Sequence, residues 1–71
     1  MTKKQKEYVL MFMRLAMRQI HPEFNPTKPL YKEMLRVYYD YGDESEELER
    51  YNIIDRQALF MYIAIKGLEE A

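Results

Sequence analysis

The chain has 71 residues and a formal net charge of −1 at pH 7, with no cysteine, one histidine, one serine and two threonines. This length allows one domain, residues 1–71, whose core is barely sufficient without association or another stabilising device. The lack of cysteine excludes disulfides and thiolate metal sites, and the few nucleophile and base candidates indicate that the protein is not an enzyme.

The first predicted helix spans residues 3–20. Thr2 is its expected N-cap, because Gln5 three residues later completes a Ser/Thr-x-x-Glu/Gln capping box, and His21 with Pro22 closes the helix. At 100° per residue, its apolar side chains cover a wider arc of the helix than packing against one neighbouring helix requires. Three residues widen this arc, and we expect some of them to be exposed in a monomer or covered by a second chain: Leu10, Met11 and Met17.

An extended segment and a second helix follow. Prolines hold residues 22–29 extended, with Phe24 as the expected anchor in the core. Thr27 is the expected N-cap of a helix that runs to about Tyr41, where Gly42 suits a left-handed C-cap. An apolar stripe along this helix predicts one buried face.

A short acidic helix is predicted over residues 43–50, where Asp43 is the expected N-cap and Glu46 lies three residues later. Its carboxylates can form a solvated face, pair with basic residues of the same or a sister chain, or recognise a basic patch on another protein. In the last case charge would speed association and exposed tyrosines would supply affinity. The protein-binding residues would then be Glu44, Glu46, Glu47, Glu49, Tyr39 and Tyr51.

The last predicted helix has Asp55 as its expected N-cap and ends near Leu68. Every residue from Ala58 to Ile65 is apolar, so the helix has no polar side through two turns. Such a helix must be covered on all sides, which two long neighbours and one short one can barely do. A buried strand is the competing interpretation of this run.

The predicted fold is therefore all-α, a small bundle of three main helices plus one short acidic helix. Homodimerisation through the last helix and part of the first would cover the apolar excess, and the alternative is a compact monomer with the last helix at its centre. Seven tyrosines, three phenylalanines and six methionines suit either a core or a surface that is buried only part of the time. The residues predicted to self-associate are Leu10, Met11, Met17, Phe60, Met61, Ile63 and Ala64.

The charged residues are sorted along the chain, with about +5 in residues 1–36 and about −6 in residues 37–71. The two blocks either fold against one another or present two differently charged faces to other molecules. The basic block supports an alternative function, a helical nucleic-acid-binding regulator whose two basic stripes straddle a phosphate backbone. The last helix offers few polar side chains for base contacts, which weighs against specific DNA recognition. The residues of this alternative are Lys3, Lys4, Arg14, Arg18, Lys28, Lys32 and Arg36.

Metal and cofactor sites are not predicted. His21 is expected to interact with the C-terminus of the first helix rather than to bind a ligand. The alternating oxygen side chains of residues 43–49 lack the turn glycine and terminal glutamate of a calcium loop, and there is no glycine-rich phosphate loop.

These features predict a small non-catalytic regulatory or inhibitory protein-binding module whose partner is another protein. No apolar run approaches the ~20 residues of a membrane-spanning helix, and the first residues do not resemble a cleavable signal peptide. We therefore expect a cytoplasmic protein with no membrane partner. Compact chains of this kind are common among accessory proteins, including those of phages and mobile elements.

Overall fold

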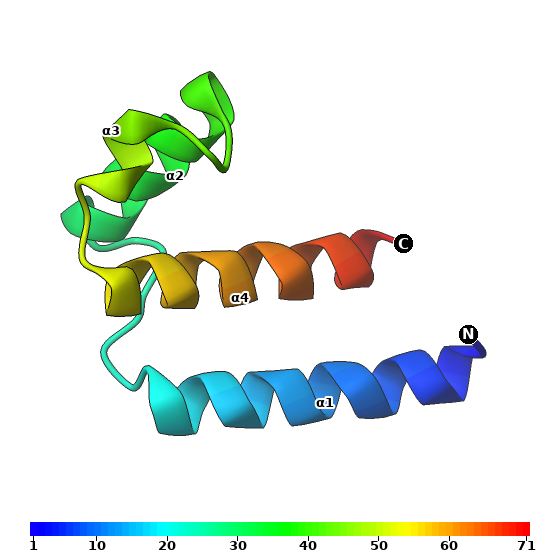
Figure 1. Cartoon of the computed structure of the whole chain (residues 1–71). Helices are drawn as coiled ribbons and strands as arrows, with labels where there is room; N and C mark the ends of the chain where they lie inside the picture. The colour runs from blue at the N-terminus through cyan, green and yellow to red at the C-terminus, as the bar shows by residue number, and fades with distance from the viewer.

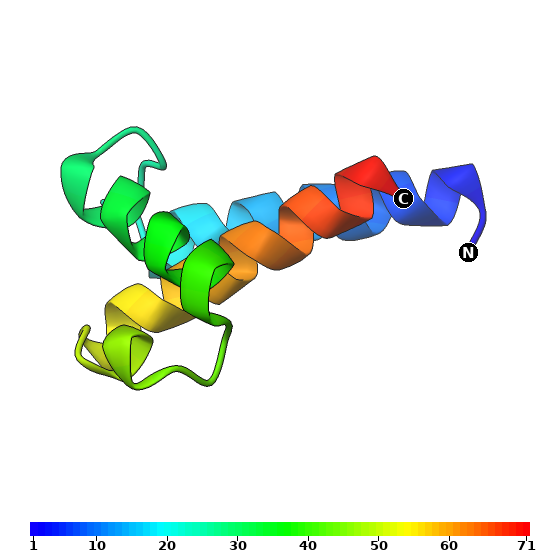
Figure 2. The same cartoon turned by 90° about the horizontal axis from the view of Figure 1, so that it is seen from above.

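The computed structural model describes every residue from Met1 to Ala71 and contains four helices and no strand (Figure 1). The all-α prediction of three main helices and one short helix is confirmed. α1 and α4 run antiparallel with both chain termini at the same end, and α2 and α3 lie on the other side of α4 near its beginning (Figures 1 and 2). The helices are α1 (Lys3–Ile20), α2 (Pro29–Tyr41), α3 (Glu46–Glu49) and α4 (Ile53–Glu70).

α1 begins at the predicted capping box. The Thr2 hydroxyl accepts a hydrogen bond from the Gln5 N–H at 3.1 Å, and the Thr2 N–H donates to the Gln5 side-chain oxygen at 2.8 Å. At the other end the His21 N–H donates to the Met17 carbonyl at 2.8 Å, and Pro22 disfavours a further turn. The predicted bounds of this helix are therefore confirmed.

α2 does not begin with the cap expected from Thr27, and this prediction is wrong. The N-cap is Lys28, which makes no side-chain cap, and Pro29 occupies the first turn. The Thr27 hydroxyl instead donates to Asn25 Oδ1 at 2.7 Å, and the same oxygen accepts the Thr27 N–H at 2.9 Å. Asn25 therefore closes a local turn that engages this hydroxyl. Gly42 ends α2 with a φ of 95°, as predicted, because glycine adopts positive φ at little cost.

The caps expected from Asp43 and Asp55 are also wrong. α3 begins after Ser45, whose hydroxyl accepts a backbone N–H at 3.2 Å. α4 begins after Asn52, whose Oδ1 accepts a backbone N–H at 2.7 Å. Serine and asparagine cap helices as well as aspartate does, so cap preference alone does not choose between neighbouring candidates.

α4 carries the apolar run 58–65 as continuous helix and ends at Glu70 rather than near Leu68. The strand interpretation of this run is therefore wrong. Leu59 is fully buried, whereas Phe60 keeps 37% of its surface exposed. The run is thus covered on two sides, by α1 and by the α2–α3 pair, and not on every side.

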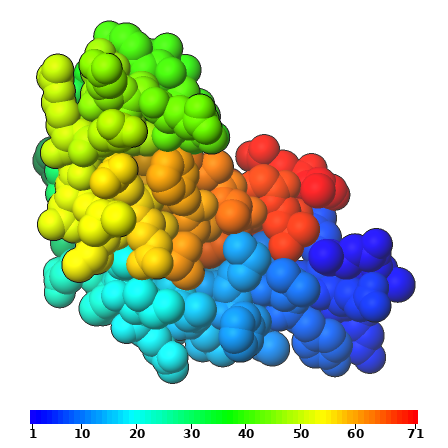
Figure 3. Space-filling view, viewed as in Figure 1, coloured from blue at the N-terminus to red at the C-terminus, as the bar shows by residue number.

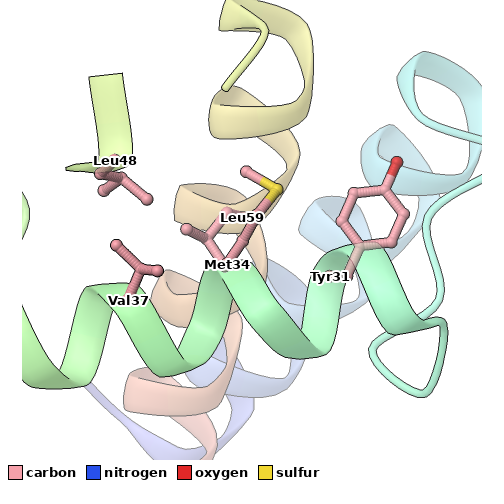
Figure 4. Close-up of a cluster of buried hydrophobic side chains, with 5 residues drawn as sticks. All are labelled: Tyr31, Met34, Val37, Leu48 and Leu59. Carbon is pink, nitrogen blue, oxygen red and sulfur yellow. The ribbon is translucent and has the colours of Figure 1, made fainter. Parts of the chain in front are cut away.

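The main core lies where α2, α3 and α4 meet (Figure 4). Phe24 anchors the extended segment as predicted, with its ring centroid 4.5 Å from that of Tyr31 and 5.3 Å from that of Tyr62. The Tyr31 hydroxyl donates to Asp55 Oδ1 at 3.1 Å and joins α2 to the first turn of α4. The buried members of this core are Tyr31, Met34, Val37, Leu48 and Leu59.

α1 packs along α4 at a separate seam. Polar contacts lie at both ends of this seam. Lys6 Nζ donates to the Ala71 carbonyl at 3.0 Å, and the ring Nε2 of buried His21 lies 3.0 Å from Gln57 Oε1. The buried apolar residues outside the main core are Leu10, Ala58 and Ile65.

The main core predicts a large stability loss from Leu59→Ala. The substitution removes a fully buried side chain and should lower the free energy of unfolding by about 2–5 kcal/mol. The matched control is Leu30→Ala, which truncates a leucine that is 44% exposed and should change stability by less than about 1 kcal/mol. Urea denaturation followed by circular dichroism measures both values, and equal losses would contradict the described core.

The Tyr31–Asp55 hydrogen bond predicts a stability difference that depends on pH. Burial, and next the hydrogen bond and charge of Asp55, raise the pKa of Tyr31 above its ordinary value. A raised folded-state pKa contributes stability that is present below the unfolded pKa, near 10, and is lost as pH rises through the folded pKa. Tyr31→Phe should therefore cost about 1 kcal/mol at pH 7, and the gap to wild type should narrow above a pH of about 10. Denaturation at neutral and alkaline pH measures this gap, and a constant gap would contradict the assigned cause.

Candidate protein-binding surface

A group of exposed apolar side chains lies on the side of α1 that faces away from α4. At 100° per residue, Leu10 and Met17 lie toward α4, and Phe12 lies on the opposite side of the helix. In Figure 3, α1 forms the lower edge of the molecule and no other helix covers its outward side. We call this surface the outer face of α1 and define it by four side chains that are each 51–73% exposed: Tyr8, Met11, Phe12 and Leu15.

A groove of about 580 Å³ follows the junction of α1 and α4. Its lining is mostly apolar and includes Arg56. Arg56 Nε is buried and has no hydrogen-bond partner. The groove therefore combines an apolar wall with one charged residue whose Nε is enclosed by the protein. This α1–α4 groove is also lined by Met13, Ile53, Gln57, Phe60, Met61 and Ala64.

The residues predicted to self-associate fall into three places. Leu10 is buried and Met17 half-buried at the seam with α4, and Ile63 packs half-buried against the main core. Met11 lies on the outer face of α1. The remaining three line the α1–α4 groove: Phe60, Met61 and Ala64.

Sequence reasoning missed three residues of the outer face: Tyr8, Phe12 and Leu15. They belong to the apolar arc of α1, but this arc covers more than half of the helix. The pattern gives the width of the arc and does not say which part of it contacts α4. That width was the available signal that part of the arc stays uncovered.

The predicted protein-binding residues do not form one surface. Tyr39 is 74% exposed and lines a cleft between α2 and the second half of α4, together with Tyr38 and Tyr62. Tyr51 is half-buried against the main core and lies with Glu47 in a different cleft, between α2 and α3. The other acidic side chains are exposed on and before α3: Glu44, Glu46 and Glu49.

The predicted basic residues are divided between two separated helices. Lys32 and Arg36 lie on the side of α2 opposite buried Met34, and α4 lies between α2 and α1 (Figure 1). The two basic stripes therefore do not meet on one surface. The exposed basic residues of α1 are Lys3, Lys4, Arg14 and Arg18.

Several of these cations already have carboxylate partners. Arg36 pairs with Glu33 and with Asp40, and its hydrogen bond to Glu33 lowers the pKa of that carboxyl and raises the pKa of the guanidinium. Lys28 lies 3.5 Å from Glu23.

One ion pair joins the first helix to the last. Arg14 lies 3.2 Å from Glu69 and connects α1 to the end of α4. The oppositely charged halves pack against one another through α1 and α4, and this ion pair joins them across that seam.

Other kinds of site find little support in the arrangement of the side chains. No three His, Asp or Glu side chains come together in a way that could hold a metal ion. None of the four helices has both the length and the apolar content that crossing a membrane requires. The chain matches no protein-family model, no curated protein and no solved structure.

Proposed function

We propose that this chain is a small non-catalytic protein-binding module of the regulatory or inhibitory type, and that it binds through the outer face of α1 and the adjoining α1–α4 groove. The observation that carries the proposal is the exposure of four large apolar side chains on one side of a regular helix. Scattered exposed apolar residues are ordinary in proteins, whereas a contiguous group on one helix face is typical of an interface.

The size of the apolar surface supports a macromolecular partner. Aromatic side chains present about 150–250 Å² each, so the exposed parts of Tyr8 and Phe12 alone amount to roughly 200 Å². Met11 and Leu15 enlarge this patch, and the α1–α4 groove extends it onto α4. Monomeric proteins rarely leave apolar patches above a few hundred Å² uncovered.

The chemistry of the surface favours protein over nucleic acid. A phosphate backbone is bound by clustered Lys and Arg, whereas the outer face of α1 presents aromatic and aliphatic side chains. The basic stripe of α2 lies beyond α4, and Arg14, Lys28 and Arg36 have carboxylate partners. Aromatic residues and methionine are the types that protein interfaces favour.

Site-directed photo-crosslinking tests the proposal. A photoreactive p-benzoylphenylalanine in place of Phe12 should yield a covalent adduct with another polypeptide when cells that produce the protein are irradiated, because Phe12 is the most exposed side chain of the outer face of α1. Gel electrophoresis with immunodetection measures the adduct, and its mass reports whether the partner is a second copy or a different protein.

Two matched variants make this experiment decisive. The same photoreactive residue in place of Lys32 lies on the exposed side of α2 and should give little adduct. Adding Leu15→Glu to the Phe12 probe should abolish the adduct, because a carboxylate is costly to bury in an apolar interface. No adduct at position 12, or equal adducts at both positions, would refute the proposed binding surface.

A further inference from the structure

We infer that the occupant of the outer face of α1 is a second copy of this chain, and that the two α1 helices pack antiparallel about a two-fold axis near Phe12. The inference rests on the proposed function, because it names the partner of the same surface. It is carried by the positions of two charged residues beside that surface, Glu7 and Arg18.

Glu7 and Arg18 lie on one flank of the outer face of α1. Eleven positions separate them, so the helical repeat places them only about 20° apart around the axis, some three turns from one another. Both side chains are exposed, and neither takes part in an ion pair within the chain. They are therefore free to pair with charges on another molecule.

An antiparallel two-fold pair brings these opposite charges together. The midpoint between Glu7 and Arg18 falls between Phe12 and Met13. When two antiparallel helices are related by a two-fold axis, the same flank of each helix faces that flank of the other. An axis at this midpoint therefore places Glu7 of each copy beside Arg18 of the other. The contact occurs twice by symmetry. In a parallel two-fold pair, opposite flanks of the two helices face one another, so Glu7 and Arg18 of one copy would not meet those of the other.

The same axis matches the apolar side chains. Tyr8 and Leu15 lie on the two sides of Phe12 at nearly equal spacing along the helix. A two-fold axis near Phe12 therefore packs the two Phe12 rings together and brings Tyr8 of each copy close to Leu15 of the other. The surface is complementary to itself, which a two-fold interface requires.

The extent of the surface suits a dimer. An 18-residue helix is about 27 Å long, and stable interfaces bury about 800 Å² on each partner. The α1–α4 groove borders α1 through Met13, across the seam from the flank of Glu7 and Arg18, and its rim carries Ile53, which is 70% exposed. Contact that spreads from the outer face of α1 into this groove enlarges the area beyond that of the two helices alone.

A charge-swap experiment tests this arrangement. Analytical ultracentrifugation should find wild type dimeric at micromolar concentrations. Glu7→Arg and Arg18→Glu should each raise the dimer dissociation constant about tenfold, because each substitution turns two attractive contacts into two repulsive ones. The double variant Glu7→Arg with Arg18→Glu exchanges the charges and should return to within about threefold of wild type.

Two controls separate charge from folding. Lys32→Glu on α2 changes the net charge as Arg18→Glu does and should leave the dissociation constant unchanged. Phe12→Glu should yield a folded monomer, with folding checked by circular dichroism, since Phe12 is 73% exposed. A dimeric Phe12→Glu variant would overturn the inference.

The remaining outcomes distinguish this inference from the proposed function. A wild type that is monomeric at about 100 μM, or a double variant as weak as the single ones, overturns the antiparallel dimer. If the photo-crosslink at position 12 then joins a different protein, the proposed function stands without self-association. If position 12 gives no adduct at all, both proposals fail.

Discussion

The structure depends on the need to cover the apolar run of α4. Residues 58–65 offer no charged side chain, so this helix buries more of its surface than the single stripe of an ordinary amphipathic helix. α2 and α3 cover the side of α4 that carries Leu59, and α1 covers the side that carries Ala58 and Ile65. The three long helices are therefore arranged as two groups that share α4 (Figure 1). α4 contributes Leu59 to the core that it shares with α2 and α3, and Ala58 and Ile65 to its seam with α1.

This arrangement leaves α1 with one main neighbour. A helix between two layers buries most of its circumference, whereas α1 buries only the strip around Leu10. Its apolar arc is wider than that strip, and the remainder forms the outer face of α1. Only nine of the 71 residues are buried, which makes the isolated fold marginal for its length. Association that covers the outer face would stabilise the folded state by mass action, so binding and folding of this chain are thermodynamically linked.

The secondary structure was largely predictable from the sequence, and the burial was predictable only in part. Thr2 with Gln5, and Gly42, marked helix ends because each satisfies a local requirement that no distant contact changes. The failed N-caps lay among competing residues of similar preference, as where Asn25 engaged the Thr27 hydroxyl. Such choices depend on how neighbouring elements meet, which local preference does not contain.

The candidate site shows the same limit more sharply. The sequence indicated that the first and last helices carry apolar side chains in excess, and the structure does leave apolar surface exposed on both. The sequence could not show which side of α1 contacts α4. An apolar arc wider than half the helix allows α1 to pack on α4 in several rotations about its own axis. Leu10 was therefore expected to be part of the excess and is buried, whereas Phe12 is the most exposed member of the outer face. The neighbouring helix, and not the apolar arc itself, decides which part of a wide arc becomes buried.

The sorted charges gain a physical role from this geometry. Arg14 and Glu69 form the ion pair that links α1 to the end of α4, and exposed pairs of this kind are worth only about 0–1 kcal/mol. Charge therefore contributes little to holding the helices together. At a surface dominated by apolar contacts, however, many orientations of a partner would be similar in energy, because the hydrophobic effect has little directional preference. Charged residues that border the apolar face discriminate between these orientations, since wrong pairings place like charges together. Under the proposed arrangement, Glu7 and Arg18 determine how the partner lies, while the aromatic and aliphatic side chains between them supply the affinity.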